Sequence, residues 1–479
     1  MNPARNWTLG VLALSLAGCN MAPRYERPAL PVPAALPPAR AGDPGDPSAA
    51  VLADTAWTDF FTDDRLRSVI RVALDNNRDL RIALANVEQA RAQYRVRRAD
   101  ILPSLSASGG ATYQKSPFAT MGAGGGAGGG AAAGTSGRLD IYSASVGVSA
   151  WEIDLFGRVR NLTKAAQEQF FAARENRNAA QVALVAEVAS AWATLAADQE
   201  QLALARKTEA AFRQTLDLTD ARFRSGIASE LEVRQARTSH DRARADIAQL
   251  TTQVAQDRNA LNLLAGATVE EALLPDGMPA QGITIDRLPS DLPSGLLLRR
   301  PDIEAAEHQL IAANANIGAA RAAFFPTISL TAALGTMSLG LSNLFASGSE
   351  TWSVAPSAAL PIFDAGRNAG NLRYAKATRD AMVATYEKTV QTAFREVADA
   401  LARRGTVTEQ MEAQTSLRDN AEGAYRLSEA RFKAGIDPFL TTLDSQRSFY
   451  AAEQGLLTTR LVRETNAVEL YRALGGGLK

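Results

Sequence analysis

Two segments of the sequence, 209 residues apart (430 − 221), are nearly identical. One is Ala221–Ile227, ARFRSGI, and the other is Ala430–Ile436, ARFKAGI. Each follows a long alanine-rich helical pattern and contains a glycine, which adopts the left-handed conformation past a helix end without a Cβ penalty. The same separation relates Gly157-Arg158 to Gly366-Arg367. The sequence therefore predicts a tandem duplication in which each copy contains a long helical hairpin.

A second helix starts directly after each of these glycines. Ser229 and Glu232 have the spacing of a capping box. In the second copy Asp437 precedes Pro438, which predicts Asp437 as the N-cap and Pro438 as the first helical residue. Return helices are expected over residues 229–265 and 438–474.

Composition excludes several classes of function. Lys plus Arg and Asp plus Glu both total 51, so the chain has no basic footprint for nucleic acid. One cysteine and two histidines cannot form a disulfide framework or a clustered Cys/His metal site. We expect surface or packing roles for His240 and His308. No nucleophile–base pair or metal set indicates an enzyme.

The single cysteine ends a signal-like segment. Arg5 precedes an apolar run, and Leu16-Ala17-Gly18-Cys19 follows it. The segment resembles a bacterial lipoprotein signal, which implies that Cys19 becomes the lipidated N-terminus; the alternative is a buried free thiol. By the same resemblance, Asn20 favours the outer membrane over retention at the inner one. The proline-rich stretch after Cys19 is typical of an extended tether.

Helical and strand periodicities alternate along both copies. A helix is expected over 63–99, with a break at Asn76-Asn77. Two longer helices are expected over 158–223 and 367–432, and each of these two would be about 100 Å long. A further helix should start at Pro301. The glycine-rich run 122–134 is interpreted as an enlarged surface loop rather than a phosphate cradle, since no Lys-Ser/Thr follows it.

Four segments with a period of two have the length of tilted membrane strands: 104–115, 139–151, 327–337 and 351–361. Trp151 and Trp352 lie near strand ends, where interfacial aromatics are expected. A soluble sandwich is the alternative. Four strands cannot close in lipid, and a dimer's eight strands would be filled by side chains. A trimer with twelve strands is the smallest arrangement that conducts.

Several motifs together identify a family. The chain resembles the TolC-type outer-membrane efflux lipoproteins, which are the outer-membrane subunits of RND-type tripartite pumps. The motifs that carry the resemblance are the lipobox Leu16–Cys19, Trp151–Arg158, Leu298–Ile303, Pro361–Arg367 and Leu443–Arg447. The resemblance implies a homotrimer whose 12-stranded outer-membrane β-barrel continues into an α-helical periplasmic barrel. It also implies a periplasmic adaptor and an inner-membrane RND-type transporter as partners. The resemblance further implies that the barrel contacts outer-membrane lipid. It implies no cofactor and one covalently attached group, the lipid on Cys19.

The predicted organisation has five parts: a signal peptide at 1–18, a lipidated tether at 19–56, a first repeat at 57–266, a linker at 267–298 and a second repeat at 299–479.

The candidate site residues lie at the two hairpin tips. Residues after the second tip share one helix face by three- and four-residue spacing. The resemblance places them at a periplasmic gate; a solvated charged face is the alternative. Adaptor contacts are expected at the tips themselves. The gate residues are Asp437, Leu440, Asp444 and Arg447, and the adaptor-contact residues are Arg222, Gly226, Arg431 and Gly435.

Two functions of different classes remain open. One is a passive exit duct for drugs or other toxic small molecules, and the other is a lipid-anchored stalk or adhesin without a lumen. The paired membrane-length strands favour the duct.

Overall fold

The computed structural model describes residues 20–39, 55–116, 137–285, 292–476 and 478. Cys19, the signal segment 1–18 and the glycine-rich run 122–134 lie outside these residues. The chain divides into two compact units. We call them the strand unit (residues up to 27, 89–171 and 308–383) and the tip unit (28–88, 172–307 and 384–479).

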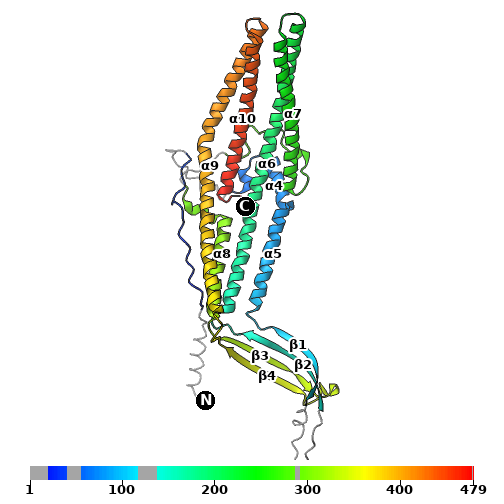
Figure 1. The fold of residues 1–479 in the computed structure, drawn as a ribbon, viewed down its shortest axis with the longest axis vertical. Helices are drawn as coiled ribbons and strands as arrows, with labels where there is room; N and C mark the ends of the chain where they lie inside the picture. The colour runs from blue at the N-terminus through cyan, green and yellow to red at the C-terminus, as the bar shows by residue number, and fades with distance from the viewer. Residues whose placement is uncertain (1–19, 40–54, 117–136, 286–291, 477, 479) are drawn as a thin grey trace, which may run out of the picture. The chain divides into compact units, whose positions relative to one another are not determined.

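Long helices make up most of the chain (Figure 1). The two longest, α6 and α9, have 67 residues each, as the duplication predicts. The expected break at Asn76-Asn77 is confirmed between α4 and α5. The helices are α3 (Trp57–Phe60), α4 (Asp64–Asn76), α5 (Arg78–Ala99), α6 (Arg158–Arg224), α7 (Glu230–Ala265), α8 (Pro301–Ala322), α9 (Arg367–Lys433) and α10 (Phe439–Ala473), with short 3-10 turns η2 (Glu271–Leu273), η3 (Ser294–Arg299) and η4 (Leu341–Asn343).

Local capping explains where these helices begin. Asn77 separates α4 from α5: its Oδ1 accepts from the backbone N–H of Leu80 (2.8 Å). The predicted capping box of α7 is present, with Ser229 and Glu232 bonded to each other's backbone. The predicted N-cap of α10 is wrong. Pro438 is the N-cap residue, with no side-chain capping bond, because the Asp437 carboxylate is bound by Arg431 instead.

The strand unit contains one antiparallel sheet with the order β1-β2-β3-β4. Its strands are β1 (Leu105–Ser116), β2 (Gly137–Glu152), β3 (Thr327–Ser338) and β4 (Glu350–Ala359), so all four predicted strands are confirmed. Strands β1 and β4 are the two edges, and neither edge is paired within the described chain.

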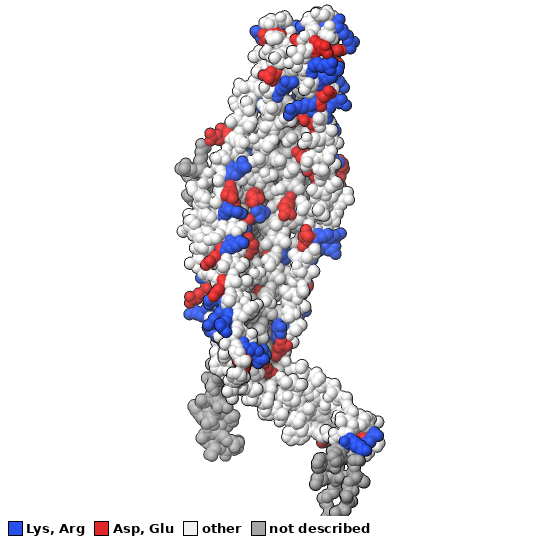
Figure 2. All heavy atoms as spheres, in the orientation of Figure 1, with Lys and Arg blue, Asp and Glu red and all other residues white. Residues whose placement is uncertain are grey.

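The two faces of this sheet differ in polarity. The register places apolar side chains on one face: Leu105, Ala107, Val146, Val148, Ile328, Leu330, Leu334, Trp352 and Val354. The other face carries hydroxyls, and two serine pairs bond across strands, Ser108 with Ser145 (3.0 Å) and Ser329 with Ser357 (2.8 Å). Of the described strand residues on this hydroxyl face, Glu152 is the one ionisable group. Figure 2 shows few charged side chains between the two ends of the sheet.

Two glycines allow β2 and β3 to approach closely. A Cβ on Gly147 would lie 2.4 Å from the Ala332 carbonyl oxygen, and one on Gly335 would lie 2.3 Å from the Ala144 oxygen. A bulge follows in β2 between Val148 and Trp151, where Ala150 has a φ of 51°. Glycines and bulges are the devices that curve a sheet.

The core of the tip unit contains large aromatic side chains and an apolar stretch of α6. Tyr471 of α10 stacks on Phe60 with ring centroids 3.9 Å apart. Trp192 of α6 is fully buried and donates from Nε1 to the Leu273 carbonyl (3.1 Å).

Helix α6 alone, among described helices, has a stretch long and apolar enough to cross a membrane. Because 61% of that stretch is buried, we assign it to the protein core.

The linker and the N-terminal segment pair with each other in this unit. Leu36 N–H donates to the Leu292 carbonyl and Ser294 N–H donates to the Ala34 carbonyl (both 2.9 Å). The buried Arg300, just before α8, donates to the Ala473 carbonyl (2.7 Å) and pairs with Glu396 (2.9 Å). The Arg300 contacts thus connect the start of α8 to the C-terminal end of α10 and to α9.

Candidate functional site

Both hairpin tips use the same backbone device. Gly226 and Gly435 have φ values of 74° and 75°. In each tip the residue after the glycine donates to a carbonyl five residues earlier: Ile227 N–H to Arg222, and Ile436 N–H to Arg431 (both 2.9 Å). No heavy atom lies within 4 Å of a Cβ built on either glycine. The left-handed conformation, not lack of space, therefore requires glycine here.

The arginines at the two tips, equivalent by the repeat, have different partners. Arg431 forms a two-bond ion pair with Asp437 (2.7 and 2.8 Å). This hydrogen bond from Arg431 holds the pKa of the Asp437 carboxyl below its ordinary value. The position equivalent to Asp437 in the first repeat is Ala228 (437 − 209), so Arg222 has no such carboxylate. Its guanidinium lies instead over the ring of Phe432, 4.7 Å from the centroid.

An apolar cluster beneath the tips joins all four helices of the tip region. It consists of Phe212 of α6, Ala236 and Ala243 of α7, Phe432 of α9, and Phe439 and Leu443 of α10. The rings of Phe432 and Phe439 are 5.7 Å apart and tilted. The two hairpins are therefore packed against each other rather than separate.

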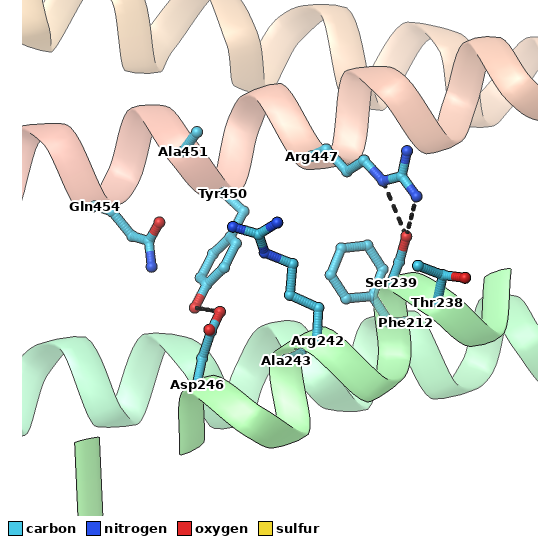
Figure 3. Close-up of a pocket in the computed structure, with 10 residues that line it drawn as sticks. All are labelled: Phe212, Thr238, Ser239, Arg242, Ala243, Asp246, Arg447, Tyr450, Ala451 and Gln454. Carbon is cyan, nitrogen blue, oxygen red and sulfur yellow. Dashed lines mark hydrogen bonds between the residues drawn. The ribbon is translucent and has the colours of Figure 1, made fainter. Parts of the chain in front are cut away.

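Two polar links connect α7 to α10 directly below this cluster (Figure 3). Arg447 donates from Nε and Nη2 to the Ser239 hydroxyl (2.9 and 2.7 Å). Tyr450 donates from its hydroxyl to Asp246 (3.3 Å). Burial, with the nearby Asp246 carboxylate, raises the pKa of Tyr450 to about 12, so its hydroxyl stays protonated and able to donate.

A cavity of about 460 Å³ lies between the helices at these links. Figure 3 shows both links beside it, with Arg242 extending between them. Its lining residues are Phe212, Thr238, Ser239, Arg242, Ala243, Asp246, Arg447, Tyr450, Ala451 and Gln454. The two polar links therefore cross from α10 to α7 at the edge of this space.

The predicted gate residues do not all meet in the protomer. Leu440 is 53% exposed and Asp444 is exposed, one turn apart on α10. Arg447, one turn further, reaches α7 rather than Asp444. Asp437 lies in the tip, paired with Arg431. Leu440 and Asp444 therefore present a surface that a neighbouring molecule could complete.

The two tips also expose the same pair of apolar residues. Ile227 and Leu231 at the first tip correspond to Ile436 and Leu440 at the second, with the separation of 209 in both cases (436 − 227 and 440 − 231). All four side chains are more than half exposed. The two tips therefore expose apolar side chains at equivalent positions.

Sequence reasoning missed the partners Ser239, Asp246 and Phe432. A usable signal was present on α7, where Ala236, Ser239, Ala243 and Asp246 recur at three- and four-residue spacing with small or polar side chains. Each histidine contacts a glutamate of α6: His240 contacts Glu209 (3.1 Å) and His308 contacts Glu168 (2.6 Å).

Comparison with known proteins decides the family. The model of the family described as "Outer membrane efflux protein" matches residues 69–267 and 292–476. The chain belongs to the outer membrane efflux protein family. The residues between the two matched segments, 268–291, lie within the predicted linker.

Relatives and solved structures of the outer membrane efflux protein family cover nearly the whole chain. The toluene efflux pump outer membrane protein TtgC of Pseudomonas putida is 45% identical over 470 residues, covering 98% of this chain and 95% of TtgC. OprJ of Pseudomonas aeruginosa is 42% identical over 475 residues, covering 99% and 96%. The open-state crystal structure of the Neisseria gonorrhoeae MtrE channel superposes with a TM-score of 0.85, at 38% identity and 96% and 99% coverage. The mainly helical fold with a small sheet is therefore the fold of outer-membrane channels.

Proposed function

We propose that three copies of this chain form the outer-membrane exit duct of a tripartite efflux pump. The family, and the relatives TtgC and OprJ by their names, support an efflux role at the outer membrane. The observation that carries the oligomeric part is the four-stranded sheet with two unpaired edges, β1 and β4, and one apolar face.

Pairing of β4 with β1 of the next copy would remove both open edges. Lipid does not tolerate unpaired backbone groups, so a membrane sheet of this kind has to close on itself. Two copies would give eight strands with a side-chain-filled interior, whereas three give twelve and leave a channel. The apolar face would then contact lipid, with Trp352 and Tyr113 near one interface and Trp151 near the other.

The hydroxyl face of the sheet would line this channel. Its serines and threonines carry no charge, and the one described carboxylate there, Glu152, is paired with Arg158. Such a wall offers hydrogen bonds to any solute but does not select by charge. Such a wall suits a passive duct in which the inner-membrane transporter selects the solute.

The tips are where the duct would meet its periplasmic partners. The exposed Ile227 and Ile436, at equivalent positions of the two tips, suit an adaptor that binds both hairpins in the same way. Three copies would also bring three Leu440 and three Asp444 side chains together around the axis. In the resting state the Arg447–Ser239 and Tyr450–Asp246 links would hold α10 against α7 and keep this end narrow.

Lipid attachment at Cys19 is part of the same proposal. It is supported by the lipobox and by the hydrogen bonds that hold residues 20–23 against α6 and α8. Cys19→Ser should abolish incorporation of radiolabelled fatty acid while leaving the sheet able to form. Label retained by the variant would contradict the lipoprotein assignment.

Conductance of the purified protein in a planar bilayer tests the duct. Discrete channels from a species with the mass of three chains are expected, whereas a lumenless stalk would give none. Restored drug resistance in cells that lack their own outer-membrane efflux protein would test the pump role separately.

A further inference from the structure

The residues directly after Cys19 are bound to α6 and α8 of the strand unit. The Asn20 side chain makes two bonds through the same oxygen: its Oδ1 accepts from Asn161 Nδ2 (2.9 Å) and from the Ala22 backbone N–H (3.0 Å). Asn20 therefore both shapes its own segment and attaches it to the first turn of α6.

Backbone carbonyls of this segment bind α8. Asn314 donates from Nδ2 to the Pro23 carbonyl (2.8 Å), and Arg321 donates from Nη1 to the Met21 carbonyl (3.2 Å). Asn161 and Asn314 are only 3% and 8% exposed. A buried amide without a hydrogen-bond partner is destabilising, so these two side chains need the partners that the segment supplies.

A glycine makes room for the segment on α8. A Cβ on Gly318 would lie 2.7 Å from the Ala22 nitrogen, 2.8 Å from the Ala22 Cα and 2.6 Å from Asn161 Nδ2. Glycine inside a helix is less favourable than alanine, so its presence here needs a reason. Close approach of another backbone explains why glycine is present here. We call Asn161, Asn314, Gly318 and Arg321 the N-terminal seat.

The seat lies where helices meet strands. Asn161 is in the first turn of α6, just after β2, and Arg321 is in the last turn of α8, just before β3. Next to it, Ala165 of α6 packs with Ala312 and Ala315 of α8. Because α6 belongs to the first repeat and α8 to the second, the seat is complete only when the two repeats have packed together.

We propose that the N-terminal seat is a binding site for the four residues after the lipid-bearing cysteine. It would hold the point of lipid attachment beside the strand ends, so that anchor and strands enter the same leaflet of the membrane. Consecutive Cα atoms are about 3.8 Å apart, which leaves a lipid on residue 19 little freedom relative to the seat. The anchoring role rests on the proposed lipidation of Cys19, whereas the binding site itself does not.

Trypsin cleavage after Arg24, which is exposed, measures release of residues 20–23 from the seat. The purified full-length mature protein in detergent is digested, and mass spectrometry follows the appearance of Tyr25 as a new N-terminus. We expect slow cleavage of the native protein and cleavage at least about tenfold faster for Gly318→Ala. Gly370→Ala is the matched control, because Gly370 also lies within a helix but has no heavy atom within 4 Å of a built Cβ.

A second pair of variants leaves α6 and α8 unchanged. Asn20→Ala removes the bridging oxygen and should accelerate cleavage, whereas Asn20→Gln keeps an amide oxygen as acceptor and should retain a rate close to the native one. Equal rates for Asn20→Ala, Gly318→Ala and the native protein would overturn the proposal.

The lipid is tested apart from the seat. Cys19→Ser should lose fatty-acid label yet keep the native cleavage rate. Faster cleavage in that variant would show that the lipid, not the seat, holds the segment.

Discussion

The guanidinium of Arg222 lies 4.7 Å from the ring centroid of Phe432, so the end of the first repeat's long helix covers the end of the second's. Phe432 is buried in the cluster that joins all four tip helices. The equivalent arginine, Arg431, turns instead to Asp437 within its own tip. The first repeat has Ala228 where the second has Asp437, so Arg222 has no equivalent carboxylate beside it. Arg222 contacts Phe432 of the other hairpin instead.

This contact should be measurable as a coupling between the two hairpins. A cation over an aromatic ring in a partly exposed site contributes about 0.5–1 kcal/mol. We expect Arg222→Ala to lower hydrogen-exchange protection at the end of α6 by about two- to fivefold. In a protein that already carries Phe432→Leu, the same substitution should have little further effect. Additive effects of the two substitutions would show that the pair does not interact.

The links between α7 and α10 should control opening. A net hydrogen-bond contribution of about 1 kcal/mol corresponds to about a fivefold change in the closed-to-open ratio. We expect Ser239→Ala and Arg447→Ala each to raise single-channel conductance. Leu440→Ala combined with Arg447→Ala should raise it further and admit large antibiotics such as vancomycin.

Arg81→Ala on α5 is the control for these gate variants and should have neither effect. Because the partner of Arg447 within the protomer is a hydroxyl, high salt should weaken this link less than it would weaken an ion pair. A double variant that conducts like the native protein at low salt would place the constriction elsewhere and leave these residues a solvated face.

The close approach of β2 and β3 makes a separate test possible. Gly147→Ala and Gly335→Ala each place a methyl group against the backbone of the neighbouring strand, and such overpacking costs about 1–3 kcal/mol. Both should reduce the yield of the trimer on semi-native gels. Gly110→Ala is the control in the same sheet, since its Cβ would meet its nearest atom at 3.7 Å. Normal trimer yield for all three variants would show that the sheet can relax.

A carboxyl pair between α6 and α7 should make stability depend on pH. Burial, followed by the hydrogen bond and charge of Asp257, raises the pKa of Asp198 to about 7. Because the folded protein then binds this proton more tightly than the unfolded chain, stability falls as pH rises from about 4 towards 7.

We therefore expect the melting temperature of the native protein in detergent to fall between pH 5 and pH 8 more steeply than that of Asp198→Asn. Asp257→Asn, which removes the other carboxylate, should flatten the profile in the same way. Parallel profiles for the native protein and both variants would rule out this pair as the source.

Much of the fold could be predicted from the sequence because its signals are local. The glycines at 226 and 435 end helices through their own backbone conformation, and Ser229 with Glu232 starts one through bonds three residues apart. The strands are recognisable from a period of two. The prediction for Asp437 was wrong because a capping bond competes with an ion pair, and only the position of Arg431 decides between them.

The duplication, the hairpin ends, the strand positions and the family were thus determined by the sequence alone, through residues that act on neighbours a few positions away. Tertiary structure decided which side chains meet across the chain. Ser239 and Arg447 are 208 residues apart in sequence, and Asn20 and Asn161 are 141 apart. Whether such groups pair depends on the packing of several helices, because a hydrogen bond forms only within about 3 Å and no sequence pattern reports that distance.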